Sequence, residues 1–216
     1  MSKTQAPPPA LKDPKVVVYK ARGGQEVQLT IDLVRNFLVT GKKELVTTQE
    51  FMYFMGICRA RGLNPFAKDC YLIKYSNDPA AIVTAIDFYR SRARAQPDCT
   101  GWEKGVICLH KETGVLRYSK GLVLASEEIV GGWFRATPVG WTVPFELEVN
   151  LSGYIKKTSD GVITKFWRPE NQPTMLAKVA ESQGLRTLWP DECQGTLTAE
   201  EAGLQLDKFE TVDISD

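Results

Sequence analysis

The sequence predicts an α+β protein with a single compact core, in which antiparallel β-hairpins and a sheet pack against several helices. Two observations lead to this class. Strand-like stretches separated by turns run from residue 101 to residue 151. Segments with helical spacing and helix-capping residues lie before and after this region. Of the 216 residues, 43% are hydrophobic and 25% are charged, which is typical of a globular domain.

We expect three regions along the chain. Residues 1–20 begin with a proline-rich stretch that opposes helix formation, which predicts a flexible N-terminal arm. We expect residues 21–190 to form the folded core and residues 191–216 to form an acidic C-terminal tail. This tail carries eight acidic residues and one lysine, whereas the preceding 190 residues carry 18 acidic and 26 basic ones. A basic body with an acidic tail is common in nucleic-acid-binding proteins, although such a tail can also be simple solubilising charge.

Capping motifs predict the helices in the first half of the chain. Thr30 can cap a helix that follows a short strand and runs to about Val39. The stretch TTQE at 47–50 is a capping box for a second helix, which ends at Gly62. Two β-prone stretches around a polar turn then predict a hairpin, and an arginine-rich helix follows. The hairpin stretches are residues 70–75 and 81–86.

The stretch TMLAKVAESQGLRTLWP, residues 174–190, predicts a helix with two different sides. Small residues on one side allow close packing, and a polar row on the other carries two cations roughly 12 Å apart along the axis. This spacing suits a phosphate backbone, and an ordinary solvated face is the alternative. The row consists of Thr174, Lys178, Ser182 and Arg186, and the small residues are Ala177, Ala180 and Gly184.

Residues that support covalent catalysis are sparse. The single histidine, His110, lies in a strand pattern, the five cysteines form no C-x-x-C pair, and no P-loop is present. We therefore expect no catalytic residues, no protein metal site and no cofactor. Glu146 and Glu148 face the same way on a predicted strand, so a metal-dependent nuclease is an alternative, as is alternating charge on a solvated sheet.

Cations with interleaved aromatic residues are more plentiful. Lys and Arg neutralise phosphates, and aromatic rings can stack on bases of any sequence, an arrangement expected of a single-strand binder. Each aromatic residue could instead belong to the core. The groups are Lys68, Tyr71 and Lys74; Tyr89, Arg90 and Arg94; and Lys165, Trp167 and Arg168.

Two longer stretches resemble a known family. They are FMYFMGICRARGLNPFAKDCYLIKY at 51–75 and FWRPENQPTMLAKVAESQGLRTLWP at 166–190, with DFYRSRA between them. In order and separation they resemble the phage recombination protein Bet branch of the RecT/Redβ family of single-strand annealing proteins, over roughly residues 30–190. Ala177 departs from the arginine that the family often has before the helix lysine.

The resemblance implies an ATP-independent recombinase that binds single-stranded DNA and the annealed duplex. It implies a homo-oligomer, as a ring or a helical filament, in the cytoplasm of a bacterial host, with a phage exonuclease and a host single-strand-binding protein as partners. A dependence of annealing on Mg²⁺, with no metal site on the protein, belongs to the same expectation. No membrane segment is expected, because the apolar runs are short. A passive coat on single-stranded DNA is a further alternative.

The resemblance also implies a DNA groove that includes Arg135. The residues that we expect to contact DNA are Lys68, Tyr71, Lys74, Tyr89, Arg90, Arg94, Arg135, Lys165, Trp167, Arg168, Thr174, Lys178, Ser182 and Arg186.

Overall fold

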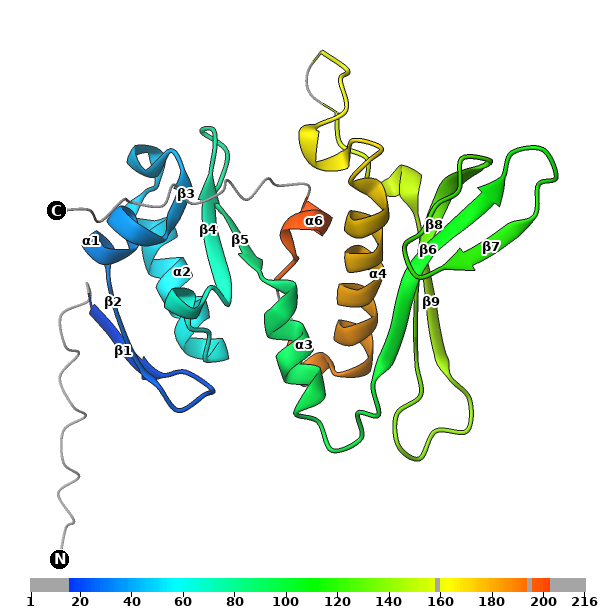
Figure 1. The fold of residues 1–216 in the computed structure, drawn as a ribbon. Coiled ribbons are helices and arrows are strands. Elements are labelled where there is room, and N and C mark those ends of the chain that lie inside the picture. Colours follow the sequence, from blue (N-terminus) through cyan, green and yellow to red (C-terminus); the bar gives the residue numbers. More distant parts are fainter. Residues whose placement is uncertain (1–15, 158–159, 194–195, 203–216) are drawn as a thin grey trace, which may run out of the picture. The chain divides into compact units, whose positions relative to one another are not determined.

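The computed structural model describes residues 16–157, 160–193 and 196–202 (Figure 1). The chain forms two compact units, within residues 1–81 and 82–216. Helices and antiparallel sheets occur together, which confirms the α+β class. Most of the predicted N-terminal arm lies outside the described residues, which begin directly with a strand. Within the described ranges, no helix has both the length and the apolar character needed to cross a membrane.

The first unit combines two strand pairs with one long helix. Strands β1 and β2 pair in antiparallel fashion, and β3 and β4 pair in parallel. The elements are β1 (Val16–Lys20), β2 (Glu26–Thr30), α1 (Ile31–Leu33), the π-helical turn η1 (Val34–Leu38), β3 (Val39–Gly41), the 3₁₀ turn η2 (Lys43–Leu45), α2 (Thr48–Arg61), the 3₁₀ turn η3 (Pro65–Ala67) and β4 (Cys70–Lys74).

The predicted capping box of α2 is confirmed. The Thr47 side chain accepts a hydrogen bond from Glu50 N at 3.2 Å, and the Glu50 carboxylate accepts one from Thr47 N at 2.8 Å. Gly62 ends the helix with a φ of 63°, a left-handed conformation that glycine adopts without strain. Local sequence signals therefore set both ends of this helix.

The helix predicted from Thr30 to about Val39 is present, and it ends at Leu38 after its second half has wound as the π-helical turn η1. Thr30 does cap α1, since its hydroxyl accepts from Leu33 N at 3.1 Å. Residues 39–41, however, form strand β3 rather than helix or loop, because they pair in parallel with β4. Gly41, at a φ of 92°, lies so close to β4 that a Cβ atom there would overlap the Lys74 carbonyl oxygen. This pairing depends on a segment about 30 residues away, which local signals do not reveal.

The second unit is built around a four-stranded antiparallel sheet with the order β7-β6-β8-β9. Strand β5 (Ala81–Thr84) leads into this unit. The other elements are α3 (Ile86–Arg94), β6 (Trp102–His110), β7 (Leu116–Ser119), β8 (Glu127–Ala136), β9 (Phe145–Asn150), the 3₁₀ turns η4 (Leu151–Gly153) and η5 (Lys165–Trp167), α4 (Gln172–Leu188), α5 (Pro190–Cys193) and α6 (Ala199–Ala202).

Helix α4 packs closely against the sheet and against α3 (Figure 1). At Gly184, a Cβ atom would overlap the ring of Phe134 on β8. At Gly132 on β8, a Cβ atom would lie 2.7 Å from the carbonyl oxygen of Leu176. The expectation that small residues let this helix approach its neighbours is confirmed. Leu176, Val179, Ala180 and Leu185 join Phe134 in the core.

We expect the substitution Gly184→Ala to lower the free energy of unfolding by about 2 kcal/mol, because the added methyl group overpacks the contact with Phe134. Gly153→Ala is the matched control in the same unit, since nothing lies within 4 Å of a Cβ atom there. Urea unfolding, monitored by tryptophan fluorescence, measures the free energy of unfolding of both variants. Equal stabilities of the two variants would contradict the close packing.

Candidate nucleic-acid interface

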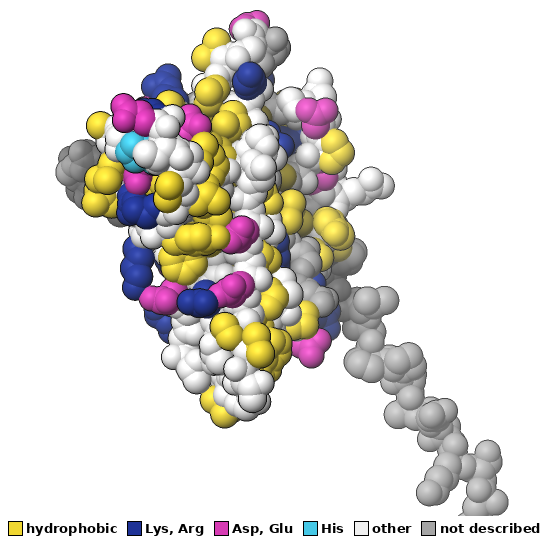
Figure 2. Space-filling view, turned by 90° about the vertical axis from the view of Figure 1, so that its right-hand side faces the viewer, with side chains coloured by type: hydrophobic (Ala, Val, Ile, Leu, Met, Phe, Trp, Pro, Cys, Tyr) yellow, Lys and Arg dark blue, Asp and Glu magenta, His cyan; other side chains and the backbone are white. Residues whose placement is uncertain are grey.

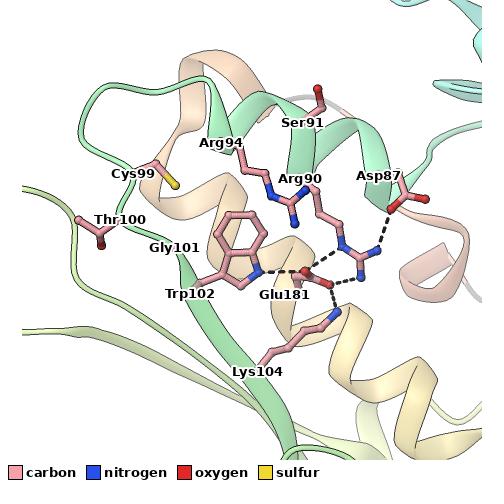
Figure 3. A pocket seen from close by; sticks show the side chains of 10 residues that line it. All are labelled: Asp87, Arg90, Ser91, Arg94, Cys99, Thr100, Gly101, Trp102, Lys104 and Glu181. Atoms are coloured by element: carbon pink, nitrogen blue, oxygen red, sulfur yellow. Dashed lines mark hydrogen bonds and ion pairs between the residues drawn. The ribbon is translucent and has the colours of Figure 1, made fainter.

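Glu181, on α4, accepts four hydrogen bonds from side chains on α3 and β6 (Figure 3). Its Oε1 atom accepts from Arg90 Nε and from Trp102 Nε1, both at 2.9 Å. Its Oε2 atom accepts from Arg90 Nη2 at 2.7 Å and from Lys104 Nζ. The Glu181 side chain is only 2% exposed. One buried carboxylate therefore joins three elements.

Burial and hydrogen bonding shift the pKa values of Glu181, Lys104 and Arg90. Burial by itself raises the pKa of Glu181, but the hydrogen bonds from Arg90, Lys104 and Trp102 outweigh it and hold this pKa below its ordinary value. Burial lowers the pKa of Lys104. The hydrogen bond to Glu181 raises the pKa of Arg90. Near neutral pH, Glu181 is therefore ionised and Arg90 is cationic.

An open cleft of about 840 Å³ lies beside Glu181. One wall comes from α3, another from the start of β6 and the turn before it, and the third from α4 (Figure 3). The cleft carries three cations and two carboxylates, and a phosphate-sized anion could enter from its open side. The lining residues are Asp87, Arg90, Ser91, Arg94, Cys99, Thr100, Gly101, Trp102, Lys104 and Glu181.

Arg94 is the most accessible cation of the cleft. Its guanidinium carbon lies 5.7 Å from the centre of the Trp102 ring, which is a cation–π contact. Arg94 is exposed and, within the part of the chain that the structure describes, pairs with no carboxylate. Arg90, in contrast, is held by both Glu181 and Asp87. Arg94 is thus the cation best placed to meet a phosphate.

A second pair of cations lies on α4. Lys178 Nζ is 3.0 Å from Glu200 Oε1, and Arg186 makes hydrogen bonds of 2.6 and 2.5 Å to the two oxygens of Glu201. Arg186 also lies over the ring of Tyr89, with 5.9 Å between its guanidinium carbon and the ring centre. Both cations that we expected on the polar row are therefore present, but α6 holds them.

Three other residues expected to contact DNA are buried in the second unit. Tyr89 is 1% exposed, and Trp167 and Ser182 are 0% exposed. Tyr89 and Trp167 belong to the core, which was the alternative left open for the aromatic residues. The exposed position expected for Ser182 is wrong, because the sheet, α3 and α6 all pack against α4. Its hydroxyl donates to Val179 O of the preceding turn, at 3.0 Å.

Arg135 lies on the sheet face opposite α4. Phe134 packs against α4, and successive residues of a strand point to opposite faces. Arg135 pairs with Glu146 there, and Glu148 accepts a hydrogen bond from Tyr118. Figure 2 views the side of the molecule where this sheet lies and shows hydrophobic side chains interspersed with acidic and basic ones. The structure therefore does not bring Arg135 to the Glu181 cleft.

The carboxylates of the nuclease alternative, Glu146 and Glu148, both face this outer side of the sheet. Each has a partner of its own, the first an arginine and the second a tyrosine. Among the described residues, no group of three or more His, Cys, Asp or Glu side chains could hold a metal ion. Alternating charge on an exposed sheet describes the pair as the structure shows it.

In the first unit, the three expected residues lie in different surroundings. Lys68 is exposed and Tyr71 is half-buried. Lys74 is 4% exposed, and its ammonium group donates to Glu50 Oε1 at 2.8 Å and to the Asp78 carbonyl at 2.7 Å. The exposed position expected for Lys74 is wrong, because this internal pair keeps it in the interior. The hydrogen bond from Lys74 lowers the pKa of Glu50 to about 2.

The remaining expected residues lie near the start of α4. Arg168 and Thr174 are exposed. The side chain of Lys165 lies outside the described part of the structure. These positions form no cluster with the Glu181 cleft in the contacts that the structure shows.

Sequence reasoning did not select Trp102, Lys104 and Glu181, which form the hydrogen-bonded group of the cleft together with Arg90. Glu181 stands between Ala180 and Ser182 on a helix rich in small residues, so a lone carboxylate on an apolar side was the available signal. A buried carboxylate requires several donors. Arginines on the preceding helix were the obvious candidates to supply them.

A cleft lined by clustered cations and an indole, on an α+β scaffold, is typical of nucleic-acid-binding proteins. A comparison with protein families gives a more specific result, since the model of the RecT family matches residues 23–214. The chain therefore belongs to the RecT family. This membership implies single-strand annealing in recombination. No curated protein matches the chain.

We expect Glu181→Gln to lower the free energy of unfolding at pH 7 by on the order of 3 kcal/mol, because Arg90 and Lys104 would lose their buried counter-charge. The folded-state pKa of Glu181 lies below its unfolded value. Its contribution is therefore present above the ordinary Glu pKa of about 4.3 and is lost as pH falls through the folded value.

Urea unfolding at pH 7 and at a series of lower pH values tests this expectation. The difference between wild type and Glu181→Gln should shrink as the pH falls. Glu170→Gln, which neutralises an exposed carboxylate in the same unit, is the control and should show no such dependence. A difference that stays constant with pH would show that Glu181 does not act through its charge.

Proposed function

We propose that this protein binds single-stranded DNA in the Glu181 cleft and anneals it to a complementary strand without ATP. The observation that carries the proposal is the convergence of Arg90, Arg94 and Lys104 around one buried carboxylate and one indole. Membership of the RecT family supports the same activity. In this proposal no covalent step is needed, because annealing requires only that two strands be positioned and their repulsion screened.

The geometry of the cleft suits reversible binding of a phosphate backbone. Glu181 holds Arg90 and Lys104 in fixed positions, so little side-chain freedom is lost when an anion arrives. The same carboxylate cancels part of their charge, which limits the strength of each contact. Arg94 supplies an accessible guanidinium at the open side. A backbone held in this way leaves its bases available to a second strand.

Neighbouring protomers would extend this binding along a strand. We propose that the protein acts as a homo-oligomer, a ring or a helical filament, on single-stranded DNA and on the annealed duplex. A phage exonuclease and a host single-strand-binding protein are the expected partners in the cytoplasm of a bacterial host. Mg²⁺ would act on the DNA rather than at a protein site. Among the remaining predicted contacts, Lys68, Arg168 and Thr174 are exposed and stay part of the proposal.

We expect Arg94→Ala to weaken binding of a labelled oligonucleotide at low salt. It should also reduce the slope of log K against log salt by about 0.7, the value for one lost single-strand phosphate contact. Fluorescence anisotropy across a salt series measures both quantities. Lys120→Ala removes an equal charge beside Glu103, outside the cleft, and serves as the control. Equal effects of the two substitutions would refute the cleft as the binding site.

Mixing two complementary labelled strands tests the activity itself. Energy transfer between the labels should rise faster with the protein than without it, in the absence of ATP. A protein that only coats DNA would slow the rise. Shortening of the strands in the presence of Mg²⁺ or Mn²⁺, abolished by Glu146→Gln, would instead support the nuclease alternative.

A further inference from the structure

The segment of residues 196–202, called here the C-terminal strap, lies against the second unit through both backbone and side chains. Leu197 forms a parallel bridge with Val83, and its carbonyl accepts from Thr84 N at 3.0 Å. The Thr196 carbonyl accepts from the Tyr89 hydroxyl at 2.5 Å. Helix α6, the end of the strap, lies beside α4 (Figure 1). The first part of the expected acidic tail is therefore docked on the unit.

The strap carries two acidic residues directly onto the cation row of α4. Glu200 meets Lys178, and Glu201 meets Arg186 through both of its oxygens. The side chains of Glu200 and Glu201 are 9% and 4% exposed, and that of Arg186 is 18% exposed. A DNA phosphate cannot reach the Arg186 guanidinium fork while Glu201 occupies it. Bidentate pairing is also the way in which arginine binds phosphate.

The contacts with α4, rather than the intrinsic stability of its short helix, keep the strap in place. Helix α6 has only four residues, which is too short to persist in isolation. Thr198 and Glu201 form a capping box, with Thr198 N donating to the Glu201 carboxylate at 3.0 Å. Segments attached in this way open locally at a lower free-energy cost than the core.

We propose that the C-terminal strap is an intramolecular competitor of DNA, which must leave Lys178 and Arg186 before these cations can bind a strand. The inference rests on the proposed function and adds its regulation. Tethering gives the strap a high effective concentration, so a single phosphate group does not displace it. A strand already bound at the Arg94 cleft presents further phosphates at a comparable effective concentration and does displace it. Full binding is therefore reserved for an extended polyanion.

The double substitution Glu200→Gln/Glu201→Gln tests the proposal, because it removes the charges and keeps the shape of the side chains. We expect oligonucleotide affinity at low salt to rise by about tenfold, and the salt slope to steepen by roughly 1.4 for two additional phosphate contacts. Glu128→Gln/Glu170→Gln removes the same charge at two exposed positions of the second unit, outside the strap, and is the matched control. An affinity gain of equal size in the control would overturn the proposal.

A combined variant shows whether the gain comes from the uncovered cations. Adding Lys178→Ala and Arg186→Ala to Glu200→Gln/Glu201→Gln should abolish the gain in affinity and the added slope. This variant also removes the cations left without partners, so it guards against a change in folding. A gain that persists without the two cations would overturn the proposal.

Limited proteolysis tests the strap in the unaltered chain. A protease that cuts after glutamate should cleave at Glu200 and Glu201 faster when a long oligonucleotide is added, and inorganic phosphate at equal phosphate concentration should have no such effect. Unchanged or slower cleavage would overturn the inference. If wild type binds DNA through Arg94 while strap variants and cleavage rates do not change, the strap inference fails alone. If neither wild type nor the strap variant binds DNA, the proposed function fails with it.

Discussion

The second unit depends on the hydrogen bonds that the buried Glu181 carboxylate accepts from α3 and β6. Taking a carboxylate out of water costs several kcal/mol, and only well-placed donors offset that cost. Here α3 and β6 each supply donors to α4, so the three elements can converge only in a geometry that satisfies all four hydrogen bonds. Without the carboxylate, Arg90 and Lys104 would repel each other at the same place. The Glu181 carboxylate thus holds the three elements together and also offsets part of the positive charge of the cleft.

Features set by neighbouring residues could be predicted from the sequence. The capping box at Thr47, the end of α2 at Gly62 and the small-residue side of α4 all follow from rules that act within a few turns. The role of Glu181 could not be predicted in this way. Its partners lie 77 to 91 residues earlier in the chain. The sequence around Glu181 does not indicate which distant side chains donate hydrogen bonds to it.

The same limit explains the buried residues among the expected DNA contacts. A helical row predicts which side chains share a side, but the number of elements that pack around the helix decides whether that side meets solvent. Ser182 shares its row with Lys178 and Arg186 and is nevertheless fully buried. Lys74 ends the apolar stretch CYLIK, where a lysine is usually exposed, yet its ammonium group donates to Glu50 and to the Asp78 carbonyl in the interior. The packing of other elements around α4 buries Ser182, and a long-range ion pair buries Lys74, so periodicity alone predicts neither position.

Glu201 performs two tasks with one carboxylate, since it caps the start of α6 and holds Arg186. An arginine pulled away from it therefore weakens the helix, and a frayed helix releases the arginine. The two events are thermodynamically linked, because one carboxylate takes part in both contacts. A spectroscopic label on α6 would consequently read out charge neutralisation at α4 as a change in secondary structure.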